Sequence, residues 1–153
     1  MNILFVCLGN ICRSPAAEAV CRDLLEKRNI TDQFTLDSAG TGAYHLGEPS
    51  DARMRKAASR RGIRISHASR QLQKEDFEHF DLILAMDRDN YQDIMARASN
   101  EQQRSKVKMF REFDPQGAGD VPDPYFGGTG GFELVMDMLE RTCDNLITRI
   151  QEQ

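Results

Sequence analysis

The sequence predicts an α/β protein, a single three-layer domain in which helices cover both faces of a four-stranded parallel sheet. Its 153 residues suit one domain with a sizeable core. Short apolar segments alternate along the chain with longer segments of helical periodicity, which is typical of a parallel sheet with helical crossovers. The chain contains no internal repeat and no long linker. We therefore expect one domain over residues 1–153.

Four short segments have the composition of strands. The first, "NILFV", is continuously apolar, and "DLILAMD" has the character of a buried strand with charges at both ends. The four expected strands lie at 2–6, 34–40, 81–87 and 106–110. Together they predict a flavodoxin-like or Rossmann-like arrangement. Ligands of such sheets bind outside the carboxyl ends of the strands, where the strand order changes direction.

Helical segments follow the expected strands. The clearest has apolar residues from Phe132 to Ile150 at a period of 3.6 residues. A second should end at Gly62, because glycine favours the position after a helix. The expected helices lie at 15–28, 51–62, 88–98 and 132–150.

Composition and charge exclude several classes of protein. The net charge of −4 argues against a general nucleic-acid binder, which would carry a basic excess. No apolar run approaches the roughly 20 residues that a membrane span requires. The apolar start "MNILFV" lacks the basic segment that opens a signal peptide. We expect a cytoplasmic protein with neither nucleic acid nor membrane as a partner.

The cysteines suggest thiol chemistry or burial rather than disulfides, because the cytoplasm is reducing. They are Cys7, Cys12, Cys21 and Cys143. None is part of a C-x2-C pair. The histidines, which are His45, His67 and His79, have no metal-ligand spacing to them. We therefore expect neither a metal nor an organic cofactor.

The stretch "VCLGNICRSP" places Cys7 at the end of the first expected strand and Arg13 six residues later. The spacing alone carries little weight, because Cys143 and Arg149 share it inside the last expected helix. Context distinguishes the first pair. Gly9 and Asn10 tolerate unusual backbone angles, and Pro15 suits the first turn of a helix.

Such a loop is suited to bind an anion. Its amide groups can turn inward, and the start of the following helix adds partial positive charge. Arg13 can hold two phosphate oxygens at once. The same positive groups would stabilise a thiolate on Cys7 and lower its pKa, and Ser14 can donate a hydrogen bond to the sulfur. The stretch predicts a cysteine nucleophile that attacks phosphorus.

A phosphorylated cysteine needs a proton donor for the departing oxygen, and Asp123 is the best candidate. It lies between two prolines in 111–131, an irregular stretch of a length that is usually functional or disordered. Tyr125 and Phe126 follow it and could form a pocket for a phenyl ring.

Over essentially its whole length, the chain resembles the low-molecular-weight protein tyrosine phosphatases. The resemblance is carried by five stretches: "VCLGNICRSP", "DSAGTGAYHLGEPSD", "SHASRQL", "FDLILAMDRDN" and "DPYFGG". The resemblance implies hydrolysis of phosphotyrosine through a cysteinyl-phosphate, without a metal. It implies that Cys7 is the nucleophile, that Arg13 binds phosphate and the transition state, and that Asp123 is general acid and then general base. Implied partners are tyrosine-phosphorylated proteins, phosphate or another oxyanion, and a cognate tyrosine kinase.

The resemblance also implies supporting residues. A left-handed Asn10 would hold the phosphate loop open, with Ser14 and His67 in its network. The loop itself would run through Leu8, Gly9, Asn10, Ile11 and Cys12. The cleft walls would be Leu8, Ile11, Tyr44, Tyr125 and Phe126. Many relatives carry tryptophan where Tyr44 stands, so we expect a changed substrate preference with activity retained.

Cys12, His67 and the basic stretch 51–70 each allow two interpretations. Cys12 either fills the loop or captures oxidised Cys7 as a reversible disulfide, which the family also suggests. His67 is either a general base or a hydrogen-bonding support. The basic stretch 51–70 is either a solvated helix face or a surface that steers acidic phosphopeptides.

Other functions of the same fold remain to be weighed. Thioredoxin-coupled arsenate reductases relay electrons through a further cysteine pair after the third strand, but residues 66–105 contain no cysteine. Phosphoarginine phosphatases of the family tend to carry threonine at the position of Ile11, where an aliphatic residue favours phosphotyrosine. A binding module without catalysis would not need Cys7, Arg13 and Asp123 together.

Overall fold

A computed structural model describes residues 1–127 and 130–153, and these contain the predicted four-stranded parallel sheet. The strands are β1 (Asn2–Cys7), β2 (Thr35–Gly40), β3 (Leu82–Ala85) and β4 (Val107–Met109). Their order in the sheet is β2-β1-β3-β4, and every neighbouring pair is parallel. The predicted fold class is confirmed.

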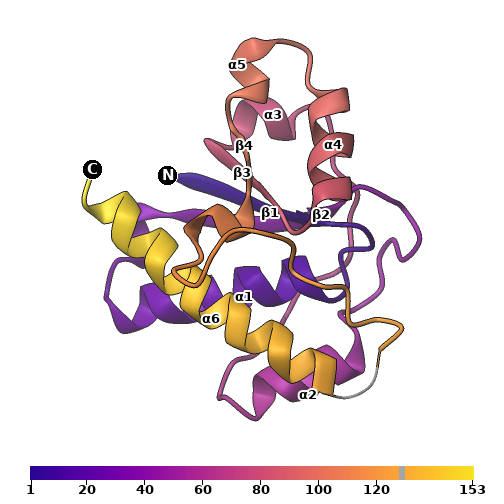
Figure 1. Cartoon of the computed structure of the whole chain (residues 1–153), viewed down its shortest axis with the longest axis vertical. Helices are drawn as coiled ribbons and strands as arrows, with labels where there is room; N and C mark the ends of the chain where they lie inside the picture. Colours follow the sequence, from indigo (N-terminus) through magenta and orange to yellow (C-terminus); the bar gives the residue numbers. More distant parts are fainter. Residues whose placement is uncertain (128–129) are drawn as a thin grey trace.

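Helices cover both faces of this sheet, as Figure 1 shows. One face carries the two longest helices and α2, and the other carries a layer of shorter helices beside β3 and β4. The first set is α1 (Arg13–Lys27), α2 (Ala52–Ser59) and α6 (Gly130–Gln151), and the second is α3 (Asp76–His79), α4 (Arg88–Arg97) and α5 (Glu101–Arg104). The three layers leave the carboxyl edge of the sheet open for a site.

Alternation along β1 divides the core in two. Ile3 and Phe5 pack with the α1 and α6 layer, whereas Leu4 and Val6 pack with residues around α3 and α4. All four side chains are fully buried. A strand that is buried on both faces must be apolar throughout, which explains the unbroken "ILFV" of the sequence.

The sequence predicts the long elements well and misses the shortest ones. The predicted helix 15–28 begins two residues earlier, at Arg13, and the strand predicted over 81–87 ends at Ala85. The unpredicted elements are α3, α5, and the 3-10 helices η1 (Thr31–Gln33) and η2 (Phe110–Phe113). Each spans a single turn, which is too short for a periodic pattern to show.

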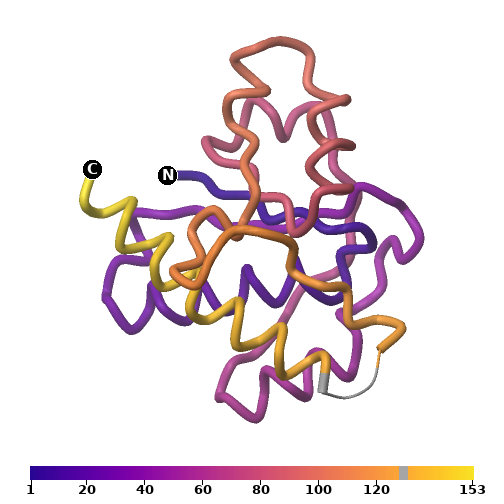
Figure 2. Tube along the Cα trace, in the orientation of Figure 1, coloured from indigo at the N-terminus to yellow at the C-terminus, as the bar shows by residue number. Residues whose placement is uncertain are grey.

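The irregular stretch after β4 is anchored by one buried carboxylate. Asp114 accepts hydrogen bonds from Arg111 at 2.9 Å and from Arg141 of α6 at 2.9 and 3.1 Å. Arg111 also donates to the carbonyls of Gly117 and Asp120. In Figure 2 this segment crosses the molecule towards the end of α6 that lies near α2. Its path is thus set by charge-assisted hydrogen bonds.

The carboxyl ends of β1 and β3 lie side by side at the centre of the sheet. The chain leaves β1 for β2 on one side and later returns to β3 on the other, so the strand order reverses at this point. Val121 reaches the same edge, where its N–H donates to the Met86 carbonyl at 2.8 Å. Cys7 and the segment carrying Asp123 therefore meet at the switch point of the sheet.

In the part of the chain that the structure describes, no helix combines the length and apolarity that crossing a membrane requires.

Asp114→Asn should destabilise the protein at neutral pH. Burial alone would raise the pKa of Asp114, but hydrogen bonds from Arg141, Gln116 N–H and Arg111 outweigh it and lower the pKa from 3.8 to about 2. A lowered folded pKa gives stability above the ordinary pKa that is lost as the pH falls through the folded one. We expect about 2 kcal/mol at pH 7, vanishing between about pH 4 and pH 2.

Urea unfolding of wild type and Asp114→Asn across pH 2 to 7 measures this. Asp144→Asn is the control, because that exposed carboxylate of α6 pairs with Arg28 at the surface and should contribute little. A difference between Asp114→Asn and wild type that is the same at pH 2.5 and pH 7 would contradict the anchoring role.

Candidate active site

The loop between β1 and α1 wraps around the sulfur of Cys7. Asn10 has a left-handed φ of 57°, a conformation that asparagine tolerates better than most residues. This turn aims the Asn10 N–H at Cys7 Sγ, at 3.3 Å, and Ser14 Oγ lies 3.0 Å from the same sulfur. Residues predicted to lie around one anion site are thus brought together.

Gly9 is required for a different reason from the predicted one. We expected it to supply an unusual backbone angle, but it is not among the glycines with positive φ. A Cβ on Gly9 would lie 3.1 Å from Cδ2 of His45. The glycine therefore permits the close approach of the loop that carries His45 and Tyr44.

Several loop amides point away from protein acceptors. Among residues 1–127 and 130–153, the N–H groups of Leu8, Gly9, Ile11 and Cys12 donate to no protein acceptor. α1 starts directly after them, at Arg13. Amides without a protein acceptor beside a helix N-terminus can bind an anion, because their partial positive charges add.

The side chain of Asn10 links this loop to the rest of the molecule. Its Oδ1 accepts from the Arg70 backbone N–H at 3.0 Å and from His67 Nε2 at 2.8 Å. Its Nδ2 donates to Ser14 Oγ at 2.8 Å and to Ser38 Oγ at 3.1 Å. The Arg70 amide can only donate, so it fixes which end of the Asn10 amide is oxygen.

That assignment makes Ser14 Oγ the acceptor of its bond with Asn10, which leaves the hydroxyl hydrogen for another partner. Asn10 Nδ2 donates to Ser14 Oγ, and the single hydroxyl hydrogen of Ser14 has two acceptors within reach, Cys7 Sγ at 3.0 Å and the Ala39 carbonyl at 3.4 Å. A thiolate on Cys7 can only accept, so in that form the nearer sulfur takes this hydrogen. Ser14 and Asn10 are both fully buried. The sulfur therefore receives two donors, one from a hydroxyl and one from a backbone amide, which favours the thiolate form.

His67 lies behind the loop and does not line the cleft around Cys7. Its Nδ1 is 3.4 Å from a carboxylate oxygen of Glu18 and 3.7 Å from one of Asp37. One ring nitrogen and one oxygen of each carboxylate all lie within 4.8 Å of one another. Glu18 already accepts from Ser38 and Arg22. This placement agrees with a supporting histidine and not with a general base that meets substrate.

Arg13 is buried, with a side chain that is 3% exposed. Its Nη1 donates to Asp87 Oδ2 at 2.6 Å and to the Val121 carbonyl at 2.9 Å, and its Nη2 lies 3.5 Å from Asp123 Oδ2. Burial works to lower the pKa of Arg13, but Cys7, Asp87 and Asp123 outweigh it and raise the pKa. The guanidinium remains charged and is held in one orientation.

Asp87 is the site residue that sequence analysis missed. It caps α4 by accepting from the Asn90 N–H at 2.8 Å, while its second oxygen holds Arg13. The available signal was its place just beyond β3, at the same sheet edge as Cys7. Predicting that Asp87 contacts Arg13 requires knowing that β1 and β3 are neighbours in the sheet.

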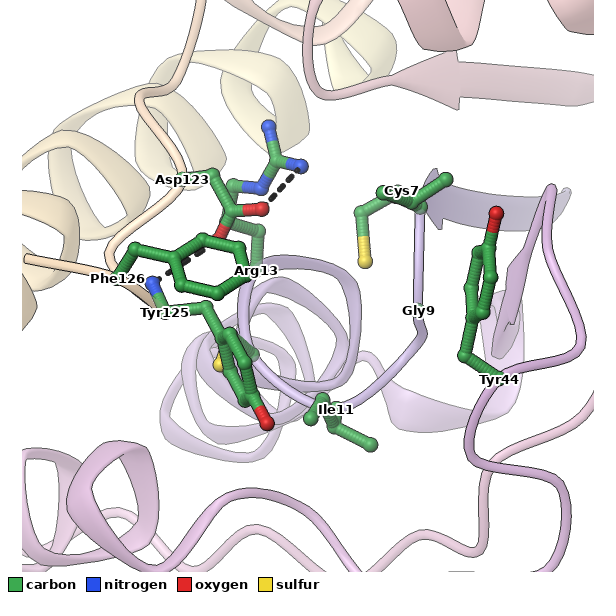
Figure 3. Close-up of a pocket in the computed structure, with 10 residues that line it drawn as sticks. Cys7, Gly9, Ile11, Arg13, Tyr44, Asp123, Tyr125 and Phe126 are labelled. Carbon is green, nitrogen blue, oxygen red and sulfur yellow. Dashed lines mark hydrogen bonds and ion pairs between the residues drawn. The ribbon is translucent and has the colours of Figure 1, made fainter.

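The cleft over Cys7 has a volume of about 210 Å³ and gathers the predicted residues. Figure 3 shows Tyr44 on one side of Cys7, with Tyr125, Phe126 and Asp123 on the other. Tyr44 and Phe126 are 74% and 92% exposed, so they form its outer rim. The lining residues are Cys7, Leu8, Gly9, Ile11, Cys12, Arg13, Tyr44, Asp123, Tyr125 and Phe126.

The remaining cysteines differ in environment. Cys12 lines the cleft but is buried, and this burial together with Asp51 and Cys7 raises its pKa well above the ordinary value. Cys143 is fully buried in α6, where its thiol donates to the Ala17 carbonyl at 3.7 Å. The second pair of the same spacing, Cys143 and Arg149, thus lies outside the site.

Acidic partners occupy much of the basic stretch 51–70. Arg60 and Arg61 pair with Glu133 of α6, Arg53 pairs with Asp51, and Arg70 pairs with Asp37 and Asp76. Four of its seven basic residues are thereby engaged within the molecule. The structural interpretation of this stretch is favoured over electrostatic steering.

A cysteine at the end of β1, an arginine six residues later and a nearby aspartate at the switch point of a parallel sheet are the arrangement that a cysteine-dependent phosphatase requires. Comparison with known proteins agrees. A family model described as low molecular weight phosphotyrosine protein phosphatase matches residues 2–153. The low molecular weight phosphotyrosine protein phosphatase of Homo sapiens is 44% identical over 144 residues, covering 93% of this chain and 90% of that protein.

Solved structures show the same relationship. A protein tyrosine phosphatase from Entamoeba histolytica superposes with a TM-score of 0.96 at 46% identity, covering 99% of this chain and 97% of that one. The YwlE arginine phosphatase superposes with a TM-score of 0.91 at 30% identity, covering 100% and 97%. The chain belongs to the low molecular weight phosphotyrosine protein phosphatase family and is a hydrolase of that class.

Asn10→Ala should cost more stability than Asn29→Ala. Both asparagines have left-handed backbones, with φ of 57° and 58°. Alanine tolerates this conformation less well, so each change should lower the free energy of unfolding by about 1 kcal/mol. Only Asn10 leaves buried partners unpaired, which should add at least about 2 kcal/mol. Urea unfolding of the two variants measures the difference, and equal destabilisation would show that the network contributes nothing.

Proposed function

We propose that this protein hydrolyses phosphotyrosine in proteins through a phosphorylated Cys7. The observation that carries the proposal is the convergence of three groups in one cleft: Cys7 Sγ with two hydrogen-bond donors, the buried Arg13, and Asp123 at 3.5 Å from Arg13. A phosphate dianion in the loop would accept from the free amides and from Arg13. This places its phosphorus over the sulfur.

In the first step, the Cys7 thiolate attacks phosphorus and the bond to the tyrosine oxygen breaks. Arg13 and the loop amides stabilise the charge on the three equatorial oxygens, and they are in position before reaction starts. Asp123, in its protonated form, gives its proton to the departing phenolate. The products are a cysteinyl-phosphate and tyrosine.

In the second step, water attacks the cysteinyl-phosphate while Asp123, now a carboxylate, takes a proton from it. The sulfur–phosphorus bond breaks, which returns the Cys7 thiolate and releases phosphate. Ser14 Oγ and the Asn10 N–H stabilise the departing thiolate, because both donate to the sulfur. Asp123 is thus restored to the protonated form in which it began.

The cleft walls support an aryl substrate. Tyr125 and Phe126 pack edge to face, with ring centroids 4.8 Å apart, and Tyr44 faces them across Cys7. A phenyl ring can enter between these aromatic walls. Phosphoarginine is the second candidate, because the YwlE arginine phosphatase has the same fold. The aliphatic Ile11 in the lining favours the phenyl ester.

Cys12 supports a redox role at the same site. A sulfenic acid formed on Cys7 by peroxide would react with the Cys12 thiol, forming a disulfide and releasing water. A dithiol then reduces the disulfide and is itself oxidised. The buried, mostly neutral Cys12 should make disulfide formation faster as the pH rises, since the thiolate is the attacking form.

The cellular setting proposed here follows from the chemistry. Free thiols at Cys7 and Cys12 fit a reducing compartment such as the cytoplasm, and residues 1–153 would act as one domain. Tyrosine-phosphorylated proteins are the proposed substrates, with a tyrosine kinase as the opposing enzyme.

Cys7→Ser should abolish turnover of p-nitrophenyl phosphate without added metal, by more than about 10³-fold, because a protonated serine hydroxyl is a far weaker nucleophile and leaving group than a thiolate. Asp123→Ala should lower kcat/KM for phenyl phosphate roughly 10²-fold, because the phenolate then leaves unprotonated. Rates are measured from pH 4 to 8, with the exposed Asp93→Ala of α4 as control. Activity that survives Cys7→Ser would overturn the mechanism, and a faster reaction with phosphoarginine than with phosphotyrosine would overturn the substrate.

Cys12→Ser should not recover activity with dithiothreitol after brief peroxide treatment, because Cys7 then proceeds to irreversible oxidation states. Cys21→Ser is the matched control, since Cys21 is a buried cysteine of α1 that does not line the cleft. Recovery of Cys12→Ser as complete as that of wild type would show that Cys12 only fills space.

A further inference from the structure

Arg53, in the first turn of α2, is held by the residue that caps its own helix. The Asp51 carboxylate accepts from the Arg53 backbone N–H at 2.8 Å, from Nε at 3.1 Å and from Nη2 at 2.9 Å. Two of these bonds come from the guanidinium and leave it little freedom. Its position is therefore set by the start of α2.

From there the guanidinium reaches the segment that carries Asp123. Arg53 Nη2 donates to the Tyr125 carbonyl at 3.0 Å. Its Cζ also lies 5.4 Å from the centroid of the Tyr125 ring and 4.8 Å from that of Phe132 in α6. One hydrogen bond and two cation–π contacts thus join α2 to the aromatic wall and to the first turns of α6.

The same pair is bonded to the nucleophile loop. The Asp51 backbone N–H donates to the Ile11 carbonyl at 2.8 Å. Asp51 and Arg53 therefore form one bridge, with the Cys7 loop at one end and the acid-bearing segment at the other. Within the described residues, Arg53 is outside the lining of the cleft, so it acts on the site through Tyr125.

Tyr125 is also the residue that orients the acid. Its backbone N–H donates to Asp123 Oδ1 at 3.0 Å, and Figure 3 shows this bond beside the contact between Asp123 and Arg13. A bond to the Tyr125 carbonyl and a bond from its N–H thus connect Arg53 to the carboxyl group in two steps. Displacing Tyr125 would move the proton donor away from the leaving oxygen.

We propose that Arg53 is a positioning residue that fixes Asp123 relative to Cys7 by clamping Tyr125. This inference rests on the proposed function, in which Asp123 protonates the leaving group. The Arg53 side chain is 44% exposed, so its loss leaves no cavity, and Asp51, whose side chain is 10% exposed, keeps its capping bond to the backbone N–H of residue 53. The effect of losing the Arg53 side chain should appear in proton transfer.

The test measures kcat/KM for aryl phosphates whose leaving phenols span a wide range of pKa. For Arg53→Ala we expect a loss of roughly tenfold with phenyl phosphate, because a displaced acid protonates the leaving group less efficiently. Aryl phosphates with acidic phenols, which leave without a proton, should react nearly as fast as with wild type. Arg60→Ala is the matched control, an exposed arginine of the same region that pairs with Glu133 instead.

The decisive measurement places Arg53→Ala in the Asp123→Ala background. If Arg53 acts through Asp123, the double variant should be no slower with phenyl phosphate than Asp123→Ala alone. An equal loss in both backgrounds, or an equal loss across all leaving groups, would overturn the proposal. Asp123→Ala alone tests the proposed function. If its kcat/KM depends on the pKa of the leaving phenol in the same way as that of wild type, Asp123 is not the general acid.

Discussion

The hydrogen bond from the Arg70 backbone N–H to Asn10 Oδ1 is the constraint on which the rest of the site depends. It fixes the orientation of the Asn10 amide, and this orientation directs Nδ2 towards Ser14, so that the Ser14 hydroxyl can donate to a thiolate on Cys7, which is nearer than the Ala39 carbonyl. The left-handed backbone of Asn10 adds a second donor to the sulfur. A buried network of this kind is valuable only when every member is satisfied, because each unpaired group would cost free energy. The proposed nucleophile therefore depends on Asn10, whose side chain contacts the rest of the molecule and does not contact the sulfur.

Charge balance is the second organising feature of the cleft. Arg13 lies between two carboxylates, Asp87 below it and Asp123 at the rim, and these offset the cost of burying a guanidinium. The pair with Asp87 is the shorter, at 2.6 Å against 3.5 Å, and Asp87 is the less exposed of the two. Asp87 thus acts as the permanent partner. Asp123 is bound more loosely, which suits the proposed proton donor, and the backbone N–H of Tyr125 holds its carboxylate.

Most of the fold follows from short-range patterns. The unbroken apolar strands, the 3.6-residue period of α6 and the glycine after α2 are local features, and each predicts its element. Cys7, Arg13 and Asp123 were singled out in the same way, and the resemblance supplied the roles proposed for them. Single-turn elements such as α3 and α5 escaped prediction because four residues carry no period. Gly9 was expected for its backbone freedom, whereas the structure requires its missing Cβ, to admit His45.

The sequence by itself determined the α/β class, the loop from Cys7 to Arg13 and the identity of the proposed nucleophile, because these depend on residues that are close along the chain. Only the tertiary structure decided the contacts between distant segments. Asp87 meets Arg13 because β3 lies beside β1, and Arg53 meets Tyr125 because α2 packs against α6. No local pattern records a contact of this kind, since the order of strands in a sheet is set by packing and crossover geometry.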